Sequence, residues 1–273
     1  MSFLSTSTRS LLSESTTTST LRAWLSETWK VFPPAFWYGA FAGAIGYSVS
    51  TWIGKWWFRS RASASFQKHV HTTLDTKQRE SFFSLMPSTV HAVVQIVGSA
   101  YVSLHGPYPT GKNPITYFDS RLLVEYGLTG FGPTVFMGIF VGYLLADWQK
   151  IGTKNLGPLM TGHHVLASLC WTMCTSLQCM QWLAVFLQFN ECSTLFVNLR
   201  QYLLTAGYAS SSKEVIGTSL AMFVTFGAVR VFPLPKIVYN WMHQDYTTLQ
   251  HSKGTGPAII TTVFISFHVL MQT

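Results

Sequence analysis

The longest apolar stretch of this chain, residues 161–198, contains a single formal charge, Glu191. A helix rises about 1.5 Å per residue and the hydrocarbon core of a bilayer is about 30 Å thick, so this stretch is too long for one crossing. We therefore expect two spans joined by a tight hairpin near 176–181. Only 10% of the 273 residues are charged, whereas soluble domains carry about 25%, so most of the surface is not expected to face water.

Further apolar segments of helical length recur along the chain. They lie at 35–54, 88–104, 133–148, 215–232 and 257–272. Pro133 is well placed to begin a helix. A membrane β-barrel would instead show short segments of alternating hydrophobicity. Together with the two spans of 161–198, these segments predict an all-α polytopic membrane helix bundle with about seven transmembrane helices.

The distribution of polar residues divides the chain into three parts. Residues 1–34 are rich in Ser and Thr and lack a continuous apolar core, so we expect a flexible tail and no secretory signal. Residues 35–80 hold the first span and a basic loop, and residues 81–273 hold the remaining spans. The loop 55–80 contains six Lys or Arg against two acidic residues, which the positive-inside rule places in the cytoplasm. The N-terminus is then lumenal and the C-terminus cytoplasmic.

The net charge of +8 has the same explanation. The basic residues lie between the apolar segments, where topology determinants are found, so no nucleic-acid partner is expected. The four cysteines fall in predicted spans and lack the paired spacing of a zinc site. We expect them to be small buried side chains, and we predict neither a metal nor a cofactor.

Several ionisable side chains share the cytoplasmic half of the predicted bilayer. They are His91, Asp147, His163, His164, Glu191 and His268. Their depths follow from the helical rise and from the predicted ends of the spans. Ionisable residues at such depths usually face the bundle interior or a wet cavity, and they indicate a functional site.

The histidine pair and Asp147 are compatible with catalysis or with a structural role. His163 or His164 can act as a general base or as an acyl-transfer nucleophile, while Asp147 orients the ring and stabilises the imidazolium. In the structural alternative, hydrogen bonds between His and a carboxylate hold helices together. A metal fits less well, because adjacent side chains on a helix point about 100° apart.

A second group of polar residues suits a lipid headgroup. Glu191 and Asn198 lie in the polar run "NECSTLFVNLR", and Arg200 is placed to anchor that helix at the interface. We predict that Glu191, Asn198, Arg200 and His91 contact lipid. For His91 taken alone, hydrogen bonding between helices is the preferred interpretation.

Three sequence elements and their spacing form a pattern. "GYLLADWQ" contains Asp147, fifteen residues separate it from "HHVLAS", and "NECSTLFVNLR" follows. In this order they resemble the TLC domain shared by TRAM, Lag1-type ceramide synthases and CLN8, over about residues 80–272. The overall size and the "E-x-S-T-x-x-x-N-x-R" run are most similar to the smaller TLC-domain-containing proteins, the TMEM56-like branch.

The resemblance implies a multi-spanning protein, often of the endoplasmic reticulum, that handles ceramide or other lipids. In ceramide synthases the adjacent histidines and nearby aspartates are catalytic, and His163, His164 and Asp147 match them. The synthases carry a further acidic residue seven positions before the first histidine, where this chain has Leu156. That departure weakens the expectation of N-acyltransferase activity.

We therefore expect an integral membrane protein of lipid homeostasis, which binds, senses or distributes a lipid such as ceramide in a cavity open to the cytoplasm. The alternative is acyl-CoA-dependent N-acylation of a sphingoid base by the histidine pair with Asp147. A third hypothesis is a TRAM-like or CLN8-like role in protein insertion or trafficking. The expected partners are ceramide, a sphingoid base or acyl-CoA, and a homodimer is compatible with the sequence.

Overall fold

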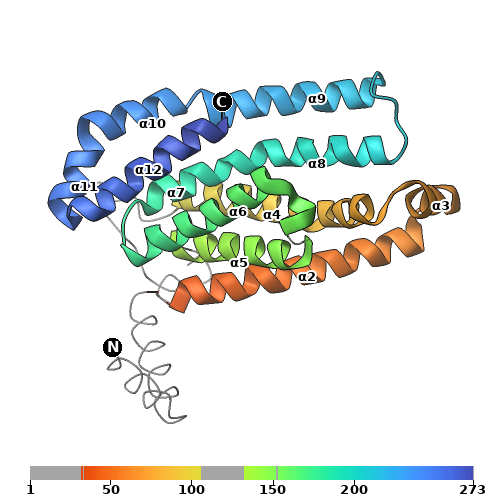
Figure 1. Ribbon diagram of the computed structural model, residues 1–273, viewed down its shortest axis with the longest axis horizontal. Coiled ribbons are helices and arrows are strands. Elements are labelled where there is room, and N and C mark those ends of the chain that lie inside the picture. The colour runs from red at the N-terminus through yellow and green to blue at the C-terminus, as the bar shows by residue number, and fades with distance from the viewer. Residues whose placement is uncertain (1–31, 33, 106–131, 152, 273) are drawn as a thin grey trace, which may run out of the picture.

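The computed structural model describes residues 32, 34–105, 132–151 and 153–272. All regular secondary structure in this part is helical (Figure 1), which confirms the all-α prediction. The predicted N-terminal tail, residues 1–34, lies outside the described residues except for positions 32 and 34. The loop 106–131 lies outside them as well.

The helices run roughly along the long axis of the molecule (Figure 1). They are α2 (Pro34–Arg61), α3 (Ala64–Thr73), α4 (Thr76–His105), α5 (Pro133–Ile151), α6 (Thr153–Ser176), α7 (Gln181–Leu187), α8 (Glu191–Thr205), α9 (Lys213–Phe226), α10 (Leu234–Asn240), α11 (Tyr246–Lys253) and α12 (Thr255–Gln272). Helix α5 begins at Pro133, as predicted. It packs against α2 and α6 and lies inside the bundle, while α4 packs against α2 and α8 and keeps one face exposed.

Glycines bring α2 and α5 into close contact. A Cβ atom added at Gly39 or Gly43 would collide with backbone carbonyl oxygens of α5, and one added at Gly138 or Gly142 would collide with carbonyl oxygens of α2. Small residues at a membrane helix interface allow the two backbones to approach in this way. Gly46, the third glycine of the same segment, has open space around it.

The expected hairpin inside residues 161–198 is present. Helix α6 ends at Ser176 and α7 begins at Gln181. Between them Gln178 and Met180 have φ angles of 49° and 57°, which is the left-handed region that non-glycine residues seldom adopt. A short 3-10 turn, Gln188–Asn190, then joins α7 to α8.

The C-terminal region departs from regular α-helix at two places. A π-helical segment, Gly227–Val231, follows α9, and a second one, Trp241–Asp245, follows α10. Pro233 lies between the first of these segments and α10. Helix α12 then folds back beneath α10 (Figure 1). π-helical turns in proteins are frequent at functional sites, and the first of these segments carries Arg230.

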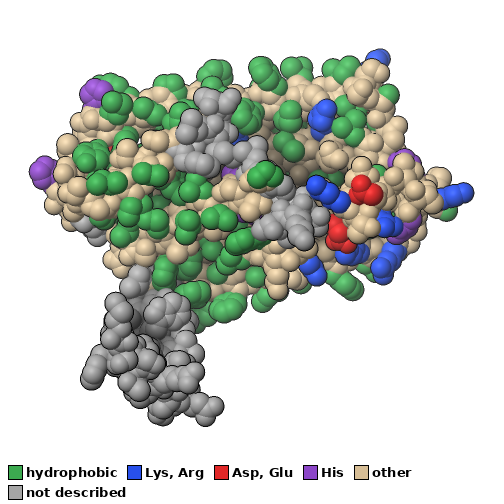
Figure 2. All heavy atoms as spheres, viewed as in Figure 1, with side chains coloured by type: hydrophobic (Ala, Val, Ile, Leu, Met, Phe, Trp, Pro, Cys, Tyr) green, Lys and Arg blue, Asp and Glu red, His purple; other side chains and the backbone are tan. Residues whose placement is uncertain are grey.

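Basic side chains gather at one end of the molecule. Figure 2 shows Lys and Arg clustered around the end that carries α3, while apolar side chains cover much of the remaining face. The predicted basic loop 55–80 is itself mostly helical, since α2 continues to Arg61 and α3 follows. The positive charge of this loop is therefore presented on helix ends.

Two helical stretches, Thr76–Leu104 and Lys213–Ser252, are long and apolar enough to cross a membrane. Thr255–Ser266 is a shorter apolar helix. Large apolar side chains such as Phe223 and Leu220 are exposed on the outer face of α9, as in a helix that contacts lipid. The count of seven spans stays a prediction.

Candidate functional site

A buried hydrogen bond joins α5 to α6. The Nε2 atom of His164 lies 2.8 Å from Oδ2 of Asp147. The two residues are only 5% and 4% exposed, so water has almost no access to the pair. Hydrogen bonds in which the donor or the acceptor is charged, such as that between an imidazole and a carboxylate, are among the stronger ones in proteins.

The hydrogen bonding of the second carboxylate oxygen of Asp147 is incomplete. Oδ1 is buried and makes no hydrogen bond to any described residue. Tyr47 of α2 lies close enough to interact electrostatically with this carboxylate, and its ring packs against that of Tyr143 with centroids 5.7 Å apart. The Asp147 carboxylate therefore interacts with His164 and with the side chains of Tyr47 and Tyr143 inside the bundle.

His91 reaches the same region from α4. Its ring stacks on Tyr143 at a centroid distance of 3.7 Å and an interplanar angle of 8°. His91 is buried, and its Nε2 atom has no partner among the described residues. His91, Tyr143 and Tyr47 all line a cavity of about 120 Å³ between α2, α4 and α5.

Glu191 belongs to a neighbouring ionic group. It begins α8 and interacts electrostatically with both Arg230 and His164. Arg230 comes from the π-helical segment after α9 and donates hydrogen bonds of 3.1 Å to Ser193 Oγ and to the backbone oxygen of Asn190. Arg230 was missed in the sequence analysis, although a lone arginine inside the predicted span 215–232 is the kind of intramembrane charge that indicates a site.

The structure gives His163 and His164 different environments. The two rings are 6.0 Å apart and nearly perpendicular, as expected for adjacent positions on a helix. His164 is buried against Asp147, whereas His163 is half-buried. No group of three or more His, Cys, Asp or Glu side chains in the described part of the chain is arranged to hold a metal.

Asn198 and Arg200 lie further toward the basic end. Asn198 donates hydrogen bonds to Ser88 Oγ (2.9 Å) and Thr89 Oγ1 (3.1 Å), which connects α8 to α4. Arg200 donates one to Ser219 Oγ (3.0 Å) on α9. Both residues therefore join helices, and the predicted lipid contacts of Asn198 and Arg200 stay predictions. The side chain of His268 lies outside the described residues.

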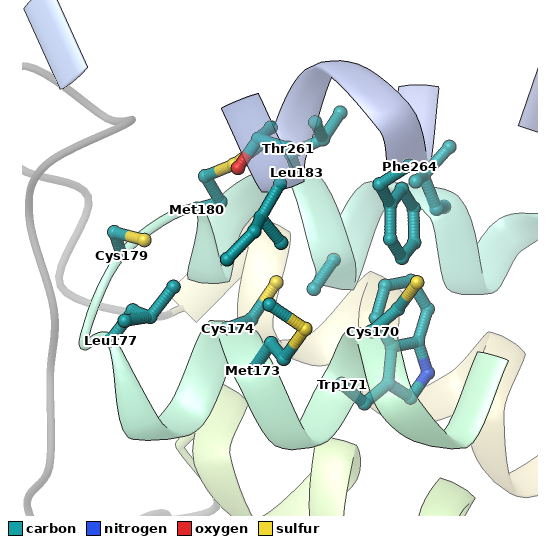
Figure 3. Close-up of a pocket in the computed structure, with 13 residues that line it drawn as sticks. Cys170, Trp171, Met173, Cys174, Leu177, Cys179, Met180, Leu183, Thr261 and Phe264 are labelled. Atoms are coloured by element: carbon teal, nitrogen blue, oxygen red, sulfur yellow. The ribbon is translucent and has the colours of Figure 1, made fainter. Parts of the chain in front are cut away.

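Three of the four cysteines line a separate pocket. Figure 3 shows Cys170, Cys174 and Cys179 around a small apolar pocket between α6, α7 and α12. Its volume is only about 30 Å³, and the described residues contain no disulfide. Cys170 and Cys179 are buried, as expected for small apolar side chains, whereas Cys174 and Cys192 are only partly buried.

The family model of the TLC domain, shared by TRAM, LAG1 and CLN8, matches residues 81–273. This chain belongs to the TLC-domain family. The family is membrane-associated and has lipid-related roles. No curated protein and no solved structure gives a significant match.

All but one of the site residues lie inside the TLC domain. His91, Asp147, His164, Glu191 and Arg230 lie within the matched region. Tyr47 belongs to α2, which precedes it. In this TLC-domain protein an additional helix therefore packs on the domain through Gly39 and Gly43, and it adds a tyrosine beside the buried aspartate.

Proposed function

We propose that this TLC-domain protein binds a membrane lipid by its polar headgroup at the Asp147–His164 pair, and that it senses or distributes that lipid. The supporting observation is the buried pair itself, in which Asp147 Oδ1 remains without a hydrogen-bond partner among the described residues. The nearby Nε2 atom of buried His91 also has no hydrogen-bond partner among the described residues.

A ligand accounts for these two atoms on energetic grounds. A buried polar atom without a hydrogen bond costs about 1–3 kcal/mol, and water inside a bilayer cannot relieve that cost as it does in a soluble protein. A headgroup with hydroxyl groups and an amide or amine supplies the hydrogen-bonding groups that these atoms lack. Ceramide has hydroxyls and an amide, and a sphingoid base has hydroxyls and an amine. Glu191, Asn198, Arg200 and His163 would be further contacts.

A second candidate is N-acylation of a sphingoid base by acyl-CoA. It is favoured by the Asp147–His164 hydrogen bond, in which a carboxylate orients an imidazole for proton transfer. The synthase-type acid is replaced by Leu156, so we rank this activity below lipid binding. We place the protein in the endoplasmic reticulum with a lumenal N-terminus and a cytoplasmic C-terminus, in keeping with its family and its basic end.

One preparation tests both candidates. The full chain is purified in mild detergent, its bound lipids are identified by mass spectrometry, and acyl-CoA with sphinganine is then added. The test variant is His163→Ala/His164→Ala, and the control is His251→Ala, which changes an exposed histidine on α11.

Lipid binding predicts a specific lipid in the wild type and the control that is depleted in the double variant, with no new ceramide. Ceramide formed by the wild type and lost in the double variant would instead establish the acyltransferase. If neither lipid nor product depends on the pair, the histidines only join helices. A trafficking role is then the better hypothesis.

A further inference from the structure

A larger cavity lies apart from the Asp147–His164 pair, between α2, α4 and α8. Its volume is about 320 Å³, which is within the range of small-molecule sites. Its wall is almost entirely apolar, and Phe58, Phe82, Phe83 and Tyr202 form the aromatic part of it. Asp147, His91 and His164 do not line it; Asn198 does, at its polar edge.

The aromatic wall is held in place by its own packing. Phe58 and Phe82 are 2% and 8% exposed, and their rings meet edge to face with centroids 5.7 Å apart. The Phe82 ring stacks on Tyr202 at 5.9 Å. The wall of the cavity is therefore built from rings of α2, α4 and α8 that support one another.

The cavity opens sideways onto the apolar surface of the bundle. Trp57 of α2, Met86 of α4 and Leu199 of α8 line it and are each more than a third exposed. A hydrocarbon chain can enter from the lipid phase by this route. A water-soluble ligand would have to cross a rim of large apolar side chains.

A positive charge lies at the mouth. The Nζ atom of Lys55 is 5.4 Å above the centroid of the Phe83 ring, and Phe83 lines the cavity. Lys55 is half-buried and forms no ion pair with a carboxylate in the described part of the chain. Arg59 is exposed one turn further along α2, so an anion near Lys55 meets a second cation.

We propose that this cavity holds one acyl chain of an anionic membrane phospholipid, with the phosphate beside Lys55 and Arg59. The acyl chain would lie along α4 between Phe83 and Thr89, in contact with the apolar wall of the cavity. A basic residue near the surface adds attraction for an anionic lipid, and Lys55 also retains its contact with Phe83. This site is separate from the headgroup site of the proposed function.

The proposal is tested by photo-crosslinking of the full chain in phosphatidylcholine nanodiscs. Each sample contains a trace of phosphatidylserine or phosphatidylcholine that carries a diazirine in one acyl chain, and the labelled peptides are mapped. We expect the phosphatidylserine probe to label residues 82–89 and 195–202 preferentially. Lys55→Glu should lower that labelling ~fivefold, and Leu195→Phe should lower it by filling the cavity.

Matched controls separate this site from general effects. Lys213→Glu reverses an exposed charge at the start of α9, and Leu220→Phe enlarges an exposed side chain on that helix; both should label like the wild type. The His163→Ala/His164→Ala variant should also be labelled like the wild type, whether or not it loses lipid at the headgroup site. Equal labelling by the two probes, labelling unchanged in Lys55→Glu, or labelling concentrated on α9 would overturn the proposal.

Discussion

His164 Nε2 of α6 lies 2.8 Å from Asp147 Oδ2 of α5, and the same carboxylate leaves Oδ1 without a partner among the described residues. One oxygen thus holds two helices together, while the other is the atom to which we assign a contact with the headgroup. In the proposed function, a single buried residue would serve both the stability of the bundle and the headgroup site. This assignment also predicts that different substitutions at the pair will separate the two roles.

The first prediction concerns Asp147. Asp147→Ala should lower the free energy of unfolding by about 1–3 kcal/mol, because buried His164 loses its partner. Asp147→Asn keeps the size and a hydrogen-bonding oxygen, so its loss should be smaller. Thermal unfolding of the purified protein in detergent measures both. Equal stability of the Ala variant and the wild type would show that the hydrogen bond contributes nothing.

The contact between α2 and α5 gives a second prediction with opposite signs at neighbouring glycines. Gly43→Ala places a methyl group against a carbonyl oxygen of α5 and should cost about 1–3 kcal/mol by overpacking. Gly46→Ala meets open space and should be neutral, or stabilising by up to about 1 kcal/mol. The same unfolding assay compares the two. If both variants behave alike, the close approach of the helices is wrong.

Arg230 and Glu191 provide a third prediction. Arg230→Met removes the positive charge facing Glu191 and two hydrogen bonds to α8 and the turn before it. Because the two residues interact, Arg230→Met and Glu191→Gln should be non-additive by about 0.5–3 kcal/mol. A double-mutant cycle of unfolding free energies measures this coupling. Strict additivity would mean that the two charges act independently.

The fourth prediction separates the two roles of His91. His91→Phe retains a ring that can stack on Tyr143, so the free energy of unfolding should change by less than about 1.5 kcal/mol. It removes the Nε2 atom, so the amount of lipid bound at the headgroup site should fall about fivefold, as for one lost hydrogen bond. Mass spectrometry of the lipids bound to the purified variant measures this amount.

His243 is the matched control for that substitution. It stacks on Tyr239 at 4.2 Å but is exposed and lies on the second π-helical segment. His243→Phe should leave bound lipid unchanged. A similar loss in both variants would assign the effect to general disturbance of the bundle.

Properties that depend on position along one helix were predictable from the sequence. Pro133 begins α5, because a proline lacks the backbone N–H that the first turn of a helix leaves unpaired. The hairpin follows Ser176, because the thickness of a bilayer limits the length of a span. The family was predictable as well, since Asp147 and the two histidines occur in order at a recognisable spacing.

Only the tertiary structure decided which side chains meet. It selects His164 over His163 as the partner of Asp147, places Arg230 beside Glu191, and sets Tyr47 of α2 against a domain that does not include it. Helical periodicity gives the depth of a residue and its angle about its own axis. The face that each helix turns toward its neighbours depends on how all the helices pack together, and that information is not contained in any single segment.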